Sequence, residues 1–109
     1  MRLVAFRKRL LFFNFMRGDS SYLLELVKLL VGAGIDVNAV DKYGAISLKY
    51  AITICKLSTD ELKNVYKYLI ETGINYKQED KFGKNCIDYA KELSWRNGFM
   101  NIVEEFEND

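Results

Sequence analysis

The sequence predicts an all-α protein, a solenoid of antiparallel helix pairs joined by protruding β-turns. Three observations lead to this fold class. One block of residues recurs at a fixed distance along the chain, apolar residues recur at helical spacing beside each copy, and strand-like alternation is nearly absent. Apolar residues at a helical period indicate helices, and a repeated helical unit indicates a stack. A chain of 109 residues is expected to form one domain.

The repeated block is a turn with parts of its flanking helices. GIDVNAVDKYG at positions 34–44 returns as GINYKQEDKFG at positions 73–83, a shift of 39 residues. The same shift pairs apolar and aromatic residues beyond the turn, namely Leu48 with Ile87, Tyr50 with Tyr89, and Ala51 with Ala90. A chance similarity between two turns would not extend into the neighbouring segments. We therefore interpret the repeat as a duplicated helix–turn unit.

A long helix precedes each copy of the turn. One is expected over residues 19–34, where Asp19 or Ser20 can cap the start, and the other over residues 58–73, which begins with the capping-box pattern of Ser58–Glu61. Each ends in a glycine suited to the left-handed conformation. The apolar stripes are formed by Leu23, Leu26, Val27, Leu30 and Val31, and by Leu62, Val65, Tyr66, Leu69 and Ile70.

Shorter helices are expected over residues 47–56 and 86–96, with a closing helix over 98–106. An Asp-Lys-aromatic-Gly tetrapeptide stands before each shorter helix. Asp41 and Asp80 can accept hydrogen bonds from the backbone of the turn, and the glycine that closes each tetrapeptide tolerates a positive φ. Acidic residues at the end of the closing helix oppose the helix dipole, so we expect its last turn to fray.

The first helix, expected over residues 3–16, is apolar and basic. Its simplest interpretation is a cap that covers the end of the stack, because a solenoid unit cannot bury both of its faces. Phe12, Phe13 and Phe15 together with the basic residues would also suit a helix lying on a membrane surface. Nucleic-acid binding is disfavoured, since the rest of the chain carries more acidic than basic residues.

Composition limits the remaining classes. Half of the residues are hydrophobic and the net charge is +1, which is typical of a folded domain. No apolar run approaches the ~18 residues of a membrane span, and basic residues interrupt the N-terminal apolar stretch where a secretory signal would be continuous. Cys55 and Cys86 lie in apolar surroundings and are expected to be buried, reduced thiols. A cytoplasmic location follows from these features.

No catalytic set is found in the sequence. The chain has no histidine, which removes the commonest general base and most zinc and iron sites. Phosphate-binding glycine motifs are absent, and the carboxylates are scattered over turns and helix surfaces. We expect a protein that is not an enzyme and has no cofactor and no metal ion.

The repeat resembles the ankyrin family, whose unit of ~33 residues has a β-turn, two antiparallel helices and a T-P-L-H-x-A signature. GAISLKYA at 44–51 and GKNCIDYA at 83–90 stand at that signature, and LVKLLVGAGIDVNAVD at 26–41 is similar to the second helix and turn. The resemblance covers residues 19–107. Proline is absent, and the unit is longer by about six residues near positions 54–59.

The family's threonine and histidine are replaced. Ile46 and Asn85 stand at the threonine position, and Lys49 and Asp88 stand at the histidine position. The usual hydrogen-bond network between repeats therefore cannot form, which predicts modest stability, and Lys49 and Asp88 are candidates for an exposed role. In this interpretation the single domain spans 1–109, with a capping helix at 1–18, a helix and turn at 19–40, a repeat at 41–79, and a C-terminal capping repeat at 80–109.

Tyr43 and Phe82 occupy the same place in the two turns. An aromatic residue at the tip of a turn has little core to enter, and aromatic residues are enriched among interface hot spots. Three lysines flank the pair, which suits a protein partner with an acidic rim; they are Lys42, Lys81 and Lys84. The competing interpretation is that each ring folds back over the neighbouring turn.

The resemblance implies a protein-binding module that uses these turns and the inner helix faces. The residues at those positions are Val40, Lys42, Tyr43, Ala45, Lys49, Thr53, Glu79, Lys81, Phe82, Lys84, Asp88 and Glu92. A small stand-alone binder or inhibitor of one partner is the leading hypothesis, and bacterial immunity proteins that neutralise a toxin provide one analogy at the level of the fold. A peripheral membrane adaptor and a self-associating structural protein are the other hypotheses. The sequence leaves the oligomeric state open.

Overall fold

The protein is mostly helical in the part of the chain that the computed structural model describes, which is residues 11–16 and 22–108. Residues 11–16 are helical, and the named helices follow in the order α2 (Leu23–Gly32), α3 (Ser47–Thr53), α4 (Thr59–Glu71), α5 (Cys86–Glu92), the 3-10 turn η1 (Ser94–Arg96) and α6 (Asn97–Glu107). These residues contain no strand, and an isolated antiparallel bridge joins Val40 to Ile46. The predicted all-α class is confirmed at this level.

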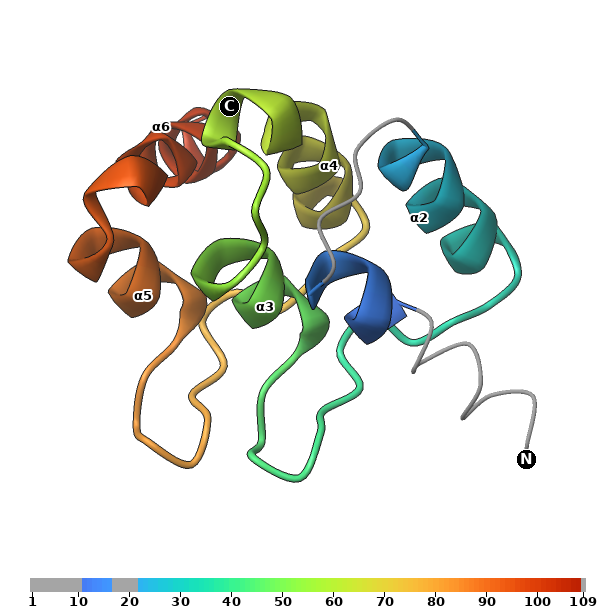
Figure 1. The fold of residues 1–109 in the computed structure, drawn as a ribbon, viewed down its shortest axis with the longest axis horizontal. Helices are drawn as coiled ribbons and strands as arrows, with labels where there is room; N and C mark the ends of the chain where they lie inside the picture. Colours follow the sequence, from blue (N-terminus) through green and yellow to red (C-terminus); the bar gives the residue numbers. More distant parts are fainter. Residues whose placement is uncertain (1–10, 17–21, 109) are drawn as a thin grey trace.

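The helices form two layers, as Figure 1 shows. The helices α2, α4 and α6 lie along one layer, and residues 11–16, α3 and α5 lie along the other. The segments that lead into α3 and α5 extend away from both layers as two neighbouring turns. The two copies of the repeated sequence therefore end at the same edge of the molecule.

The core lies between the two layers. Its centre includes Tyr66 and Phe99, whose rings meet edge to face with centroids 5.1 Å apart, and the Tyr66 hydroxyl donates a hydrogen bond to the backbone oxygen of Ala51. Such a buried hydroxyl would destabilise the fold if it had no acceptor. Almost every residue of the two predicted apolar stripes is buried or packs against this cluster.

The capping box at the start of α4 is confirmed. Ser58 Oγ accepts a hydrogen bond from the Glu61 N–H, and Glu61 accepts one from the Ser58 N–H. A second capping box, between Asn85 and Asp88, begins α5. The expected caps of the first long helix, Asp19 and Ser20, lie outside the described residues, and Tyr22 at its N-cap position makes no capping bond through its side chain.

Two expected helices were predicted too long. The helix predicted over 47–56 ends at Thr53, and the one predicted over 86–96 ends at Glu92, after which Leu93 is extended and a separate 3-10 turn begins. The backbone oxygens near the end of α3 are taken by the side chain of Arg96, so the chain is held in a loop there instead of continuing as a helix.

The final helix is slightly longer than the predicted 98–106, and the fraying of its last turn stays a prediction. It continues to Glu107, whose carboxylate accepts a hydrogen bond from the Tyr76 hydroxyl and lies 3.3 Å from Lys77 Nζ. These bonds, from Tyr76 first and then from Lys77, lower the pKa of Glu107. Contacts with the preceding turn region thus offset the unfavourable position of an acidic residue at a helix C-terminus.

The described part of the first helix packs into the core. Phe12 and Phe15 are buried, and the Phe12 ring meets Tyr50 edge to face with centroids 5.6 Å apart, whereas Phe13 is exposed. The rings of Phe12 and Phe15 are therefore not available to a membrane surface, which favours the capping interpretation. The basic residues of this helix lie outside the described part. Within the described ranges, no helix is long and apolar enough to cross a membrane.

Both cysteines are buried free thiols, as expected. Burial raises the pKa of Cys86 to about 12 and also raises the pKa of Cys55. A thiol with a raised pKa is a poor nucleophile, so neither residue has the properties of a reactive cysteine.

Candidate functional site

The first turn is built around the carboxylate of Asp41. Its Oδ1 accepts hydrogen bonds from the backbone N–H groups of Tyr43 and Ala45, at 2.9 and 3.0 Å. The turn closes where the Gly44 N–H donates to the Asp41 backbone oxygen, and Gly44 has a φ of 73°. An aspartate that accepts backbone N–H bonds two residues on, followed by a glycine at positive φ, is the predicted chemistry of this turn.

The second turn repeats this arrangement. Asp80 Oδ1 accepts from the N–H groups of Phe82 and Lys84 at 2.9 and 3.3 Å, and Gly83 has a φ of 74°. Both tetrapeptides are therefore turns of the same kind, as the sequence predicts.

A tyrosine in the following helix completes each turn. The Tyr50 hydroxyl donates to Asp41 Oδ2, and the Tyr89 hydroxyl donates to Asp80 Oδ2. The repeat aligns Tyr50 with Tyr89, but this role was not predicted from the sequence. The signal was present in the spacing, because each tyrosine follows its aspartate by nine residues.

Lys49 connects the two turns. Its Nζ lies 3.3 Å from Asp80 Oδ2, and the same ammonium lies 5.2 Å from the centroid of the Phe82 ring and 5.0 Å from that of Tyr89. The Lys49 side chain is 14% exposed, so it is mostly inside the structure. The predicted exposed role for the lysine at this position does not fit the structure; Lys49 joins one repeat to the next, and the partner-facing surface lies further out.

The carboxylates of both turns are held ionised. Burial alone would raise the pKa of Asp80, but hydrogen bonds from the Tyr89 hydroxyl and from two backbone N–H groups, with the nearby Lys49, outweigh it and lower the pKa. The pKa of Asp41 is lowered in the same way, against the effect of burial, chiefly by the Tyr50 hydroxyl. Most of the capacity of both carboxylates to accept hydrogen bonds is therefore used inside the protein.

The two turns are fastened side by side. The Lys81 N–H donates to the Tyr43 backbone oxygen at 2.9 Å, and a Cβ placed on Gly44 would come within 3.5 Å of the Lys81 nitrogen. Further from the tips, the Asn75 N–H donates to Asn38 Oδ1 at 2.6 Å. The backbone of each turn thus supports the other.

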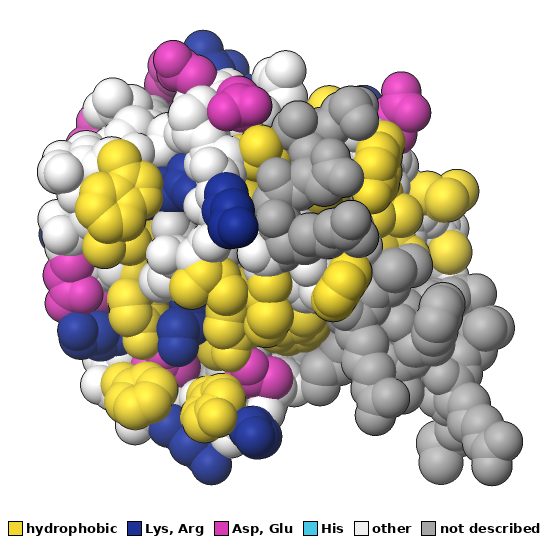
Figure 2. Space-filling view, in the orientation of Figure 1, with side chains coloured by type: hydrophobic (Ala, Val, Ile, Leu, Met, Phe, Trp, Pro, Cys, Tyr) yellow, Lys and Arg dark blue, Asp and Glu magenta, His cyan; other side chains and the backbone are white. Residues whose placement is uncertain are grey.

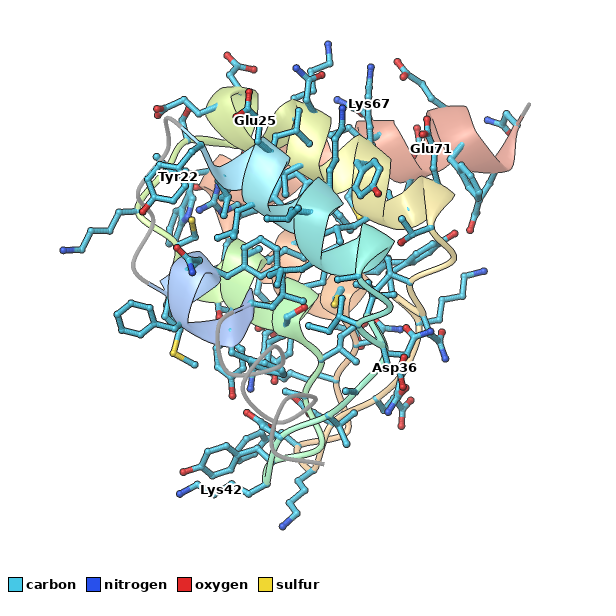
Figure 3. All side chains as sticks on the ribbon, turned by 90° about the vertical axis from the view of Figure 1, so that its right-hand side faces the viewer. Tyr22, Glu25, Asp36, Lys42, Lys67 and Glu71 are labelled. Carbon is cyan, nitrogen blue, oxygen red and sulfur yellow. The ribbon has the colours of Figure 1, made fainter. Side chains whose placement is uncertain are left out.

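The aromatic rings at the tips remain exposed. Tyr43 is 43% exposed and Phe82 is 65% exposed, and Figure 2 shows two neighbouring hydrophobic side chains over the turns, with basic groups beside and below them. Lys42 Nζ lies 5.1 Å from the Tyr43 centroid. In Figure 3, Lys42 projects at the tip of the turns, far from Lys67 and Glu71 on α4. The rings therefore have area free for contact, and they do not fold fully over the neighbouring turn.

The other predicted site residues fall into two groups. Lys81, Glu79 and Glu92 are exposed, and Lys84 pairs with Glu92 at 2.7 Å. The rest have structural contacts and little or moderate exposure: Val40 in the bridge to Ile46, Ala45 at 2% exposed, Thr53 donating to the Lys49 backbone oxygen, and Asp88 in the capping box of α5. A partner cannot reach the side chain of Ala45.

The edge opposite the turns is built around a buried arginine that was not predicted from the sequence. Arg96 is 1% exposed, and its Nε and Nη2 donate to the backbone oxygens of Ile52 and Cys55 at 2.8 and 2.7 Å. Its Nη1 donates to Thr59 Oγ1 at 3.3 Å. No spacing in the sequence distinguishes this arginine from an exposed one, because all its partners lie more than thirty residues away.

No metal centre can be assembled from the described residues, which contain no group of three or more acidic, cysteine or histidine side chains suited to one. A comparison with models of known protein families finds no match for this chain. The turns with their exposed rings are consequently the best-defined candidate site, and we call the exposed parts of Tyr43, Phe82, Lys42, Lys81 and Lys84 the turn surface.

Proposed function

We propose that this chain is a protein-binding module without catalytic activity, built as a small ankyrin-type stack, and that it binds one protein partner through the turn surface. The observation that carries the proposal is the pair of exposed rings held at equivalent places on two turns. The paired helices, the protruding turns and the repeated sequence support the ankyrin-type interpretation.

Preorganisation supports binding at the turn surface. Each turn is closed by bonds to an aspartate, and the two turns are joined by the bond from the Lys81 N–H to the Tyr43 backbone oxygen. A ring on a rigid support loses little conformational entropy when it is buried by a partner. Aromatic residues so placed are common anchors of interfaces.

The charges support a partner with an acidic rim. Asp41 and Asp80 are occupied by internal hydrogen bonds, while Lys42 and Lys81 are exposed; Lys84 is 42% exposed in its side chain and is paired with Glu92. The turn surface thus presents lysines around two apolar rings. Lysines at the rim of an interface mainly accelerate association and select an acidic surface.

An inhibitor of one enzyme or toxin is the narrower form of the proposal, and an immunity protein acting in the cytoplasm is one case of it. The single turn surface favours one binding event over the assembly of several partners. Only the identity of the captured protein separates these cases, so the experiment below identifies the partner before it assays inhibition.

The test is a pull-down from a lysate of the source cell at low and high salt, with mass spectrometry. The bait is the wild-type chain or a Tyr43→Ala, Phe82→Ala double variant. We expect one protein in stoichiometric amount with the wild-type bait, retained at high salt, and its loss with the double variant. If it proves to be an enzyme or toxin, inhibition of its activity by the wild-type chain is the next assay.

The matched control is Leu29→Ala. Leu29 lies on α2 and is 69% exposed. The turns lead into α3 and α5, which belong to the other helix layer, so this change removes an exposed apolar side chain away from the turn surface. Capture by the control bait must equal that of the wild type. A protein retained equally by all three baits, or no captured protein, would contradict the proposal.

A further inference from the structure

The chain presents a further exposed aromatic residue at the edge opposite the turns. Trp95 is the only tryptophan, it lies in η1 between α5 and α6, and it is 60% exposed. Tryptophan is the residue type most enriched at interface hot spots, because it buries a large area and has few torsions to freeze. None of the sites considered so far uses it.

The backbone that presents Trp95 is fixed from both sides. The Thr59 hydroxyl at the start of α4 donates to the Trp95 backbone oxygen, and the next residue, Arg96, is buried with its guanidinium against α3. The Arg96 N–H donates to the Leu93 oxygen at 2.8 Å, which closes the 3-10 turn. An exposed indole on this support is preorganised in the same sense as the rings on the turns.

Ile54 adds apolar surface to this edge. Ile54 directly follows α3 and is 49% exposed. The backbone oxygen of the next residue, Cys55, accepts a hydrogen bond from Arg96. Ile54 begins the loop over residues 54–58, the place where the repeat unit is longer than the ankyrin pattern. The longer loop therefore carries one exposed apolar side chain at this edge, and we call Ile54 and Trp95 the loop surface.

The turn surface and the loop surface can share one occupant. In Figure 2, hydrophobic side chains gather on the visible face in separate groups, over the turns and over the connection from α5 to α6. The molecule measures 36 × 31 × 28 Å along its principal axes. Figure 2 views it down the shortest axis, as Figure 1 does, so the face that it shows measures 36 × 31 Å. An ordinary interface covers about 800 Å² on each partner, so a round one is about 32 Å across, close to the whole of this face.

The exposed charges around the loop surface are of both signs. Lys56 and Lys91 are exposed and adjoin the loop surface along the chain, as Lys42 and Lys81 adjoin the rings of the turns. The acidic Glu92 nearby is paired with Lys84, and the exposed Asp60 and Glu61 follow the loop at the start of α4. The lysines of the turn surface therefore set the preference for an acidic partner, and the loop surface adds mainly apolar area to the same interface.

We propose that Trp95, supported by Ile54, is a second anchor for the protein partner that binds the turn surface, so that one acidic partner spans the face from the turns to the loop. The inference rests on the proposed function and extends its binding surface. It assigns the indole to the interface and Arg96 to the support beneath it.

The first test repeats the pull-down with Trp95→Ala and Trp95→Phe baits. Loss of the indole is expected to weaken binding of the purified partner by at least about 30-fold, with partial recovery in the phenylalanine variant. Because Trp95 is exposed, the thermal midpoint of the free Trp95→Ala chain should match the wild type. Ile54→Ala is the second variant, with a smaller loss of affinity.

The second test observes the indole directly. The chain labelled with 5-fluorotryptophan has one fluorine resonance, since it has one tryptophan. Addition of the purified partner is expected to shift or broaden that resonance in the wild-type background.

The outcomes separate the two proposals. If the double variant of Tyr43 and Phe82 loses the partner while Trp95→Ala retains full affinity and the resonance is unchanged, the loop surface is overturned and the binding function stands. If the wild-type bait captures no protein, both proposals fall. If Trp95→Ala loses affinity but is also unfolded, the fluorine resonance of the wild-type chain decides whether Trp95 lies at the interface. We expect that resonance to move on binding only if the indole contacts the partner.

Discussion

The two edges of this molecule are built in different ways. The turn edge is made twice from local chemistry, in which an aspartate accepts bonds from residues two, four and nine positions later. The loop edge is made once, from contacts between residues far apart in the chain, and its centre is the buried guanidinium of Arg96. Both edges present exposed aromatic residues.

The difference concerns where the stability of each edge comes from. Each aspartate turn has its hydrogen-bond partners within nine residues. Loss of its aspartate would therefore disturb that turn and the neighbouring turn. Arg96 connects the end of α3, the start of α4 and the entry to α6, so its loss would affect three elements at once. We therefore expect substitutions at the loop edge to destabilise the whole fold more than equivalent changes in a turn.

Replacing Arg96 should have the largest effect. Arg96→Met keeps much of the volume and leaves the buried backbone oxygens of Ile52 and Cys55 without this donor, and each buried group without a partner costs about 1–3 kcal/mol. We expect the free energy of unfolding, measured with urea, to fall by about 3 kcal/mol or more. Lys91→Met, an exposed basic residue on α5, is the matched control and should change it little. A loss below that of the turn variants described next would show that the loop edge is not the more important one.

The two turns provide a smaller, internal comparison. Asp41 and Asp80 each accept two backbone N–H bonds and one tyrosine hydroxyl, but only Asp80 also pairs with Lys49. We expect Asp80→Ala to reduce the free energy of unfolding by about 2–3 kcal/mol and Asp41→Ala by about 1–2 kcal/mol. Equal losses would mean that the Lys49 contact adds no net stability. In the Lys49→Met background the difference between the two variants should disappear.

The same carboxylates predict how stability depends on pH. Both have pKa values below the ordinary 3.8 in the folded protein, so the unfolded chain binds protons first as pH falls. Their stabilisation is therefore fully present above that value and is lost as pH drops through the folded pKa. Urea midpoints measured from about pH 5 to pH 2 should decrease, and Asp80→Asn should make the decrease shallower. An unchanged slope in that variant would show that Asp80 does not contribute to it.

The smallest effect on stability is expected at the exposed rings. Tyr43→Ala with Phe82→Ala removes side chains that are largely in solvent, so the urea midpoint and the helical circular dichroism should change little, by about 0.5 kcal/mol or less in unfolding free energy per site. A large loss of helicity would mean that the rings stabilise the stack, as the Lys49 contact to Phe82 would allow, and do not serve only as anchors.

The sequence predicted the parts of the fold that depend on local patterns. The α4 capping box, the aspartate turns and the positive φ of Gly44 and Gly83 follow from residues a few positions apart. The predicted ends of α3 and α5 were wrong. For α3, the backbone oxygen of Ile52 is bonded by an arginine more than forty residues later, which no local pattern reveals. The position of Lys49 inside the repeat contact was also missed, since a charged residue on a short helix usually points to solvent.

The candidate site was predictable to a similar extent. Tyr43 and Phe82 were selected from their equivalent places in the repeat, and their exposure agrees with a role at a surface. Ala45 and Asp88 were selected by position in the ankyrin pattern, and they serve as core and as helix cap. Trp95 had no repeated counterpart, so the repeat gave no reason to select it.

The affinity of the captured partner tests the central claim most directly. The partner is purified, and its dissociation constant is measured for the wild-type chain and for the Tyr43→Ala, Phe82→Ala double variant under conditions where both are folded. We predict that the double variant loses at least about 2 kcal/mol of binding free energy, roughly 30-fold in the dissociation constant. An unchanged dissociation constant would contradict the account, because the turns would then be a structural repeat with no role in binding.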